Sequence, residues 1–278
     1  MWTKILTVSL ALVMVLSLAA CAKEAEDEVG LPSPQEIVDG VIESLDNIRT
    51  YQFDMDMTMD MAGEAEGEAF EASMIMDGSG TLDLDNKQMR MDMTMSMAVT
   101  GEDEIEMAME MYLIGDMMYM MMEIPEVEPM WIKSEMPEGT WEAMSQVEPQ
   151  IELLEVAQVE VIGSERVGGI DCYVLEVTPD MEQLWQLIMQ QAEMAGEMPP
   201  FTEEMFRSFS VKQWVAKDIY FLTKVEINMA MELTPEAMGF PEEEGVVTMD
   251  IAMNLLAYSY NQPVSIVLPP EAEEAVPM

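Results

Sequence analysis

Residues 51–61 read YQFDMDMTMDM, and this stretch decides the fold class of the chain. Apolar residues, mostly methionine, alternate here with polar residues, mostly aspartate. Successive side chains of a β-strand point to opposite faces, so a period of two is typical of a strand with one apolar face and one face in water. We therefore predict a β-strand here, in a sheet that is wet on one side.

The same alternation continues along the chain and predicts an antiparallel meander. It recurs at residues 70–84, 89–99 and 105–113. The Asp85-Asn86-Lys87 segment predicts a turn, and Gly101-Glu102-Asp103 predicts a hairpin loop. Gly78 and Gly80 interrupt the second segment, where we expect a bulge or bend.

Further strands and three helices are predicted outside the meander. The strands fall at 117–123, 130–133, 159–167, 170–178, 209–216, 220–233 and 246–260, with Gly168-Gly169 as a hairpin turn. Ser33-Pro34-Gln35-Glu36 is a capping box with proline at the first helical position, and apolar residues then recur at helical spacing to about Arg49. Two more helices are expected at 140–156 and 179–196.

The first residues have the three parts of a bacterial lipoprotein signal. A short start with Lys4 precedes an apolar run from Ile5 to Leu18, and small residues lead to Cys21. The run is shorter than the roughly 20 residues that cross a bilayer. We expect residues 1–20 to be removed and Cys21 to be acylated, although an ordinary secretory signal is the alternative. The protein would then face the extracytoplasmic side, as a periplasmic or cell-surface protein held by its lipid.

Composition limits the domain organisation and the partners. The acidic residues 21–32 are expected to form a tether, 33–268 a single domain and 269–278 an acidic tail. A net charge of −44 repels nucleic acid and anionic headgroups, while it favours solubility and a cationic protein partner. If Cys21 is acylated, Cys172 has no disulfide partner. We expect a monomer.

Several short motifs resemble the mycobacterial LppX and LprG-like lipoproteins and, more distantly, the LolA-type lipoprotein carriers. They are the Cys21 signal, Thr50-Tyr51-Gln52-Phe53, Trp131-Ile132-Lys133, and the segments 213–218 (QWVAKD) and 258–264 (YSYNQPV). The resemblance covers roughly residues 34–269. It implies an α+β fold, in which helices cover the concave face of a strongly curved antiparallel sheet, a half barrel that holds acyl chains.

Catalysis is not expected from this sequence. The chain has no histidine, which excludes Ser-His-Asp catalysis and histidine-ligated zinc or copper. Its acids lack the EF-hand order of calcium ligands. Thioethers are ligands for Cu(I), but alternate residues of one strand lie roughly 6.6 Å apart, so a single run supplies no site, although neighbouring strands could. We predict no cofactor and no metal.

The methionines support two interpretations. Methionine is flexible and adapts to irregular or changing contents, so the strand faces could line a cavity for lipid or acyl chains. The alternative is a structural or interaction lipoprotein with a solid methionine core. We favour a non-catalytic carrier that moves lipid or lipoprotein across the envelope. Its predicted lining residues are Met57, Met59, Met74, Met91, Met93, Met95, Met107, Met109, Trp185, Ile188, Met229 and Met249.

Overall fold

The fold is taken from a computed structural model that describes residues 31–65, 68–101, 103–136, 141, 157–182, 205–233 and 246–277. Its helices are α2 (Pro34–Leu45) and α6 (Pro270–Glu273). Its strands are β1 (Thr50–Ala65), β2 (Glu68–Asp83), β3 (Gln88–Val99), β4 (Ile105–Ile114), β5 (Met117–Glu123), β6 (Met130–Glu135), β7 (Gln158–Val167), β8 (Ile170–Thr178), β9 (Phe206–Ala216), β10 (Leu222–Leu233), β11 (Val247–Tyr258) and β12 (Val276–Pro277).

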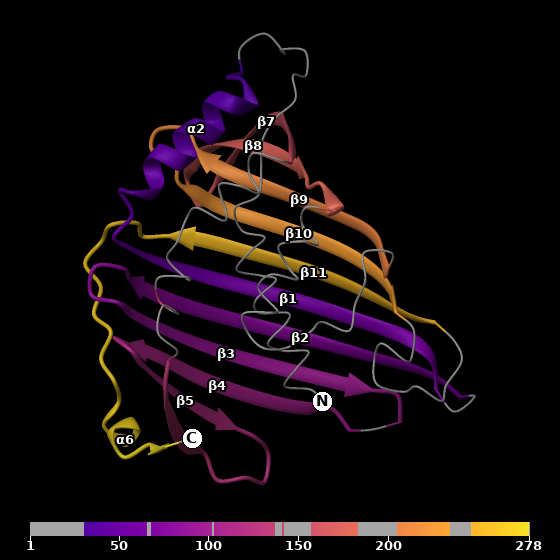
Figure 1. Ribbon diagram of the computed structural model, residues 1–278. Helices are drawn as coiled ribbons and strands as arrows, with labels where there is room; N and C mark the ends of the chain where they lie inside the picture. The colour runs from indigo at the N-terminus through magenta and orange to yellow at the C-terminus, as the bar shows by residue number, and fades with distance from the viewer. Residues whose placement is uncertain are drawn as a thin grey trace. The chain divides into compact units, whose positions relative to one another are not determined.

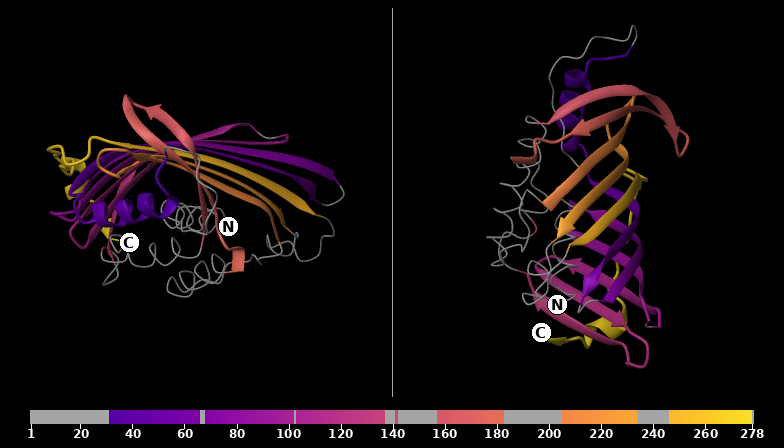
Figure 2. Two further views of the ribbon diagram at one scale, coloured as in Figure 1. Left: turned by 90° about the horizontal axis from the view of Figure 1, so that it is seen from above. Right: turned by 90° about the vertical axis from the view of Figure 1, so that its right-hand side faces the viewer.

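The strands form one open sheet in the order β12-β6-β5-β4-β3-β2-β1-β11-β10-β9-β8-β7 (Figure 1). The pairs from β2 to β6 and from β7 to β10 are antiparallel, whereas β12 lies parallel to β6. The long strands bend along their length (Figure 2). The predicted α+β fold with a curved antiparallel sheet is confirmed. The helices expected at 140–156 and 179–196 lie outside the described residues, apart from Trp141 and 179–182.

The chain divides into two compact units. One comprises residues 1–46, 62–69 and 146–250, and among its described elements are α2 and β7 to β10. The other comprises residues 47–61, 70–145 and 251–278, with most of β1 and β2 and all of β3 to β6. We call them the first unit and the second unit.

Helix α2 begins at the predicted capping box. The backbone N–H of Ser33 donates to the Glu36 carboxylate (2.9 Å), and the N–H of Glu36 donates to the Ser33 hydroxyl (3.3 Å). The helix buries Ile37, Val38 and Val41 in the first unit. The two hydrogen bonds of the capping box satisfy backbone N–H groups that have no partner within the helix.

The predicted end of this helix at Arg49 is wrong, because α2 ends at Leu45. The Ser44 hydroxyl donates to the carbonyl of Val41 (2.7 Å), within the last turn. Arg49 then donates its backbone N–H to Asn261 Oδ1 (2.8 Å), and its carbonyl accepts from the backbone N–H of Leu84 (2.8 Å), just before β1 begins at Thr50. Contacts with residues far away in the sequence therefore determine the backbone here, although the helical spacing of apolar residues continues.

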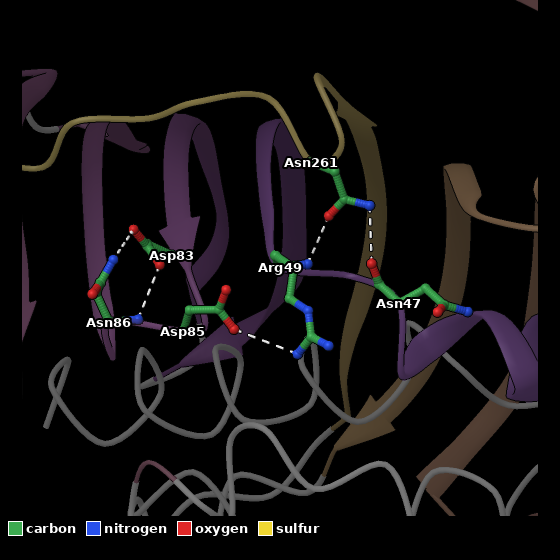
Figure 3. Close-up of polar contacts among 6 residues, drawn as sticks. All are labelled: Asn47, Arg49, Asp83, Asp85, Asn86 and Asn261. Atoms are coloured by element: carbon green, nitrogen blue, oxygen red, sulfur yellow. Dashed lines mark hydrogen bonds and ion pairs between the residues drawn. The ribbon is translucent and has the colours of Figure 1, made fainter.

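Polar side chains tie the start of β1 to the β2–β3 turn and to residue 261 in the second unit (Figure 3). Asn261 Nδ2 donates to the Asn47 carbonyl (2.9 Å), and Arg49 forms an ion pair with Asp85 (3.4 Å). The Asp83 carboxylate accepts from the backbone N–H and Nδ2 of Asn86 (3.0 and 2.8 Å). The predicted turn at residues 85–87 is confirmed.

The pairing of β2 with β3 shows no bulge at Gly78 and Gly80, so the expected bulge is wrong there. Strand β2 pairs with β3 without a register shift from Ala72 to Asp83. At residue 80 a Cβ atom would lie 2.3 Å from the Phe53 ring, so glycine is needed there for space.

Residues 270–277 fall in the segment that we expected to be an acidic tail. They form α6 and β12, and Val276 of β12 pairs with Ile132 of β6. Ala272 and Ala275 are buried. This part of the chain therefore contributes to the sheet of the second unit.

Candidate functional site

The strand register of the second unit brings the methionines to one face of the sheet. Residues directly opposite each other in an antiparallel pair point to the same face. Met95 of β3 lies opposite both Met76 of β2 and Met107 of β4, and Met109 of β4 lies opposite both Met93 of β3 and Met122 of β5. Alternation along each strand then places the remaining methionines.

Strand β1 contributes to the same face. A Cβ atom at Gly78 would meet Met55 Cε of β1 at 3.5 Å and Met93 Cγ of β3 at 3.2 Å. We call this face the methionine surface, and its methionines are Met55, Met57, Met59, Met61, Met74, Met76, Met89, Met91, Met93, Met95, Met97, Met107, Met109, Met111, Met118, Met120 and Met122.

Burial of the methionine surface decreases from β1 towards β5. Met57 and Met59 of β1 are 3% and 2% exposed, and Met91 of β3 is 3% exposed. Met107 and Met109 of β4 are half-buried, whereas Met122 of β5 is 41% exposed. The surface is therefore a continuous apolar area that is covered at one side and accessible to solvent at the other.

The first unit presents a different kind of apolar face. There Val177 lies opposite both Val159 and Val211, and Val211 lies opposite Ile227. These four side chains are between 0% and 3% exposed. β-Branched side chains are stiff and pack closely, and Met229 and Met231, which share this face with Ile227, are also buried, so the described part of this face is less accessible than the methionine surface.

Tyrosines lie on β1 and just after β11 in the second unit. Tyr51 precedes Phe53 by two residues, and its ring stacks on Tyr260 with centroids 5.7 Å apart. Burial raises the pKa of Tyr51 to about 12 and also raises the pKa of Tyr260. Both rings therefore lie in an apolar environment that disfavours the charged phenolate.

The other face of the second unit is polar but carries one aromatic cluster that our sequence analysis missed. The Arg90 guanidinium lies 5.6 Å from the centre of the Tyr112 ring, and Tyr112 packs on Trp131 at 5.9 Å. A hydrogen bond to Asp92 raises the pKa of Arg90. Tyr112 alternates with apolar residues along β4, so the sequence indicated that it lies on the face opposite the methionines. The sequence did not indicate its contacts with Arg90 and Trp131.

The predicted lining residues separate into three groups. Met57, Met59, Met74, Met91, Met93, Met95, Met107 and Met109 lie together on the methionine surface. Met229 and Met249 are each 5% exposed and belong to the first unit. Trp185, Ile188 and the acylation site Cys21 lie outside the described residues. The prediction omitted Met55, Met76, Met89 and Met111, which are all buried, although the same alternation contained them.

Reactive groups are few in the described ranges. Cys172 is a buried, free thiol that packs on Val174 and Trp214 in the first unit, and burial raises its pKa. Histidine, cysteine and acidic side chains form no metal-binding group of three or more there. Among the described helices, none has the length and apolar character needed to cross a membrane.

These features define the class of protein: its fold is an open, mostly antiparallel sheet, and methionines line the apolar face of the second unit. The chain belongs to the family described as a family of unknown function (DUF6612), which matches residues 33–277. Comparison with curated proteins finds no match.

Among solved structures, the chain is similar to the Mycobacterium tuberculosis lipoprotein LppX, with 11% identity over 84% of this chain and 97% of that chain and a TM-score of 0.40. It is also similar to LprF from Mycobacterium bovis, with 12% identity over 86% and 99% of the two chains and a TM-score of 0.43. A DUF1329 family protein from Desulfovibrio piger has 13% identity over 83% and 94%, with a TM-score of 0.23. LppX is the lipoprotein that our sequence analysis named.

Proposed function

We propose that this chain is a lipid-anchored protein of the cell envelope that binds the acyl chains of a lipid or lipoprotein against its methionine surface and carries them between membranes. The single observation that carries the proposal is the burial gradient across β1 to β5. An apolar surface that is covered at β1 and exposed at β5 can shield an acyl chain that enters from the β5 side.

The chemistry of methionine supports an acyl ligand. The side chain is unbranched and flexible, so it can repack around chains of different length and saturation, as methionine-rich surfaces do with varied partners. Each methylene group removed from water contributes about 0.8 kcal/mol, so a long acyl chain needs no polar contact to bind tightly.

The charge distribution keeps the protein in solution while the apolar surface is available. Asp54 and Asp56 of β1 are exposed and alternate with the buried methionines. They accept hydrogen bonds from the Tyr258 hydroxyl (3.1 Å) and from Asn254 Nδ2 (2.8 Å) of β11, on the face opposite the methionine surface. Acids on that face repel other copies of the chain. We infer a binding protein and not an enzyme, since the methionine surface offers no general acid or base.

Copurifying lipid tests the acyl-chain proposal. The full chain is purified in its lipidated form, and organic extracts are analysed by mass spectrometry beyond the lipid of the anchor. Met95→Lys places a charge on the methionine surface, and we expect it to lower the amount of bound lipid at least tenfold. Thr94→Lys is the matched control, because Thr94 is exposed on the polar face of the same strand.

Two results would contradict this function. Wild-type protein without any copurifying lipid would favour the structural or interaction lipoprotein with a solid core. Equal losses in the Met95→Lys and Thr94→Lys variants would mean that added positive charge, and not the methionine surface, determines the retention of lipid. Melting temperatures within a few degrees of each other establish that both variants are folded.

The anchor is tested separately, at Cys21. We expect mass spectrometry of the N-terminal peptide to show an acylated cysteine, and Cys21→Ala to abolish both the modification and the membrane attachment. An unmodified Cys21 in membrane fractions would refute the anchor while leaving the acyl-chain proposal to its own test.

A further inference from the structure

The register of β3 and β4 places three methionine pairs in a row, and the two pairs that are less buried than Met91 and Met111 lie at the corners of a rectangle. Met93 lies opposite Met109, and Met95 lies opposite Met107, with all four side chains on the methionine surface. We infer that these residues form a thioether site for a soft monovalent cation, Cu(I) or Ag(I). We call the four residues the thioether quartet.

The spacing of the quartet allows the sulfur atoms to converge. Residues two apart on a strand are about 6.6 Å apart, and opposite strands are about 4.8 Å apart, so each Cβ atom lies about 4 Å from the centre of the rectangle. A metal–sulfur bond of about 2.3 Å, as in zinc–thiolate sites, then requires each side chain to lean inward by only about 2 Å. A methionine side chain is unbranched and long enough to do so.

The pairing of β3 with β4 brings methionines of two strands together, which one strand alone cannot do. Methionines of one strand are too widely spaced to share an ion, but the two directly opposite pairs provide four ligands around one point. Thioethers are soft ligands that select Cu(I), while Ca²⁺ and Mg²⁺ prefer oxygen. Methionine does not titrate, so protons do not compete for the site.

The position of the quartet permits an ion to enter. Met93 is 6% exposed, whereas Met95, Met107 and Met109 are half-buried. Asp92 and Glu110 lie directly opposite each other on the reverse face, one residue from Met93 and Met109. Together with a net charge of −44, these carboxylates attract cations to this part of the sheet.

Direct binding tests the site. The full chain, with Cys172→Ala to remove a competing thiol, is titrated anaerobically with Cu(I) against a chromogenic chelator. Ag(I), which does not change its oxidation state here, is titrated in parallel and followed by the methyl NMR signals of the methionines. We expect the first equivalent of Ag(I) to shift the methyl signals of the quartet first and most strongly.

A matched pair of variants locates the ligands. In the quartet variant Met93, Met95, Met107 and Met109 are replaced by leucine, and in the control variant Met229, Met231, Met249 and Met253 are replaced in the same way. On the β9 side, Met229 and Met231 lie opposite Phe209 and Phe206, and all four control methionines are at most 5% exposed, so they are less accessible to an ion than the half-buried residues of the quartet. We expect at least a tenfold loss of Cu(I) affinity in the quartet variant and no loss in the control.

The site would be refuted if the wild-type protein left all Cu(I) on the chelator, if both variants lost affinity equally, or if Ag(I) shifted other methyl signals first. The inference does not depend on acyl-chain binding. The Cu(I) and Ag(I) titrations measure metal directly on the Cys172→Ala chain, whereas the acyl-chain proposal is read from lipid extracted from wild-type protein, so each test can fail while the other succeeds. Loss of the metal and loss of the lipid can therefore be told apart.

Discussion

Replacing Gly80 with alanine should destabilise the second unit, because the methionine surface is filled at this point by an aromatic ring. A Cβ atom at residue 80 would lie 2.3 Å from Cε1 and Cζ of Phe53 and 3.1 Å from the carbonyl oxygen of Arg90. The Phe53 ring is rigid and 9% exposed, so it has to move as a whole.

The magnitude follows from two opposing effects. Overpacking a core costs about 1–3 kcal/mol, whereas alanine stabilises a strand interior by about 0.5–1 kcal/mol relative to glycine. We expect the free energy of unfolding to fall by about 1–2 kcal/mol. For a chain of this size, each kcal/mol corresponds to roughly 2–4 °C in melting temperature.

Urea denaturation and thermal melts measure this change, with Gly78→Ala as the matched control on the same strand and face. At residue 78 the nearest atom is Met93 Cγ at 3.2 Å, in a side chain that can adjust, so we expect a change near zero. A double-mutant cycle with Phe53→Leu should recover at least about 1 kcal/mol of the Gly80→Ala loss. A Gly80→Ala variant as stable as wild type, or a cycle without coupling, would refute the packing argument.

Two further predictions concern α2 and Tyr51. Ser33→Ala removes the capping box and should lower the free energy of unfolding by about 1 kcal/mol in urea denaturation, whereas Ser33→Asp should retain most of it. Tyr51 has a pKa of about 12, above its usual value of 10.0, so the unfolded chain loses this proton first and the free energy of unfolding falls between pH 10 and 12, by about 2–3 kcal/mol. Tyr51→Phe should reduce that fall, and an equally steep pH profile in the variant would contradict the assignment.

Strand alternation predicted the local structure of the second unit well, because it depends only on neighbouring residues. Residues 51–61 and 89–99 contain the information about which side chains share a face, and β1 and β3 confirm it. The capping box likewise predicted the start of α2 at Pro34, since all of its contacts lie within one turn.

Features that depend on distant residues were not predictable in this way. Gly80 looked like a bend because nothing in its own strand shows that Phe53 needs the space. The helical spacing extended to about Arg49, yet Asn261 and Leu84 hold the Arg49 backbone outside the helix, next to the start of β1. The pairing of Met95 with Met107 depends on register, and the alternation of each strand alone permits several registers.

Strand β12 is only two residues long, and it is the outermost strand beside β6, which has six. It pairs with only Ile132 and Lys133 of β6, so without it the unpaired edge of β6 would be longer, and an unpaired edge is where another chain can add as a strand. A protease that trimmed the chain before Val276 would therefore enlarge the place at which another extended segment could extend this sheet.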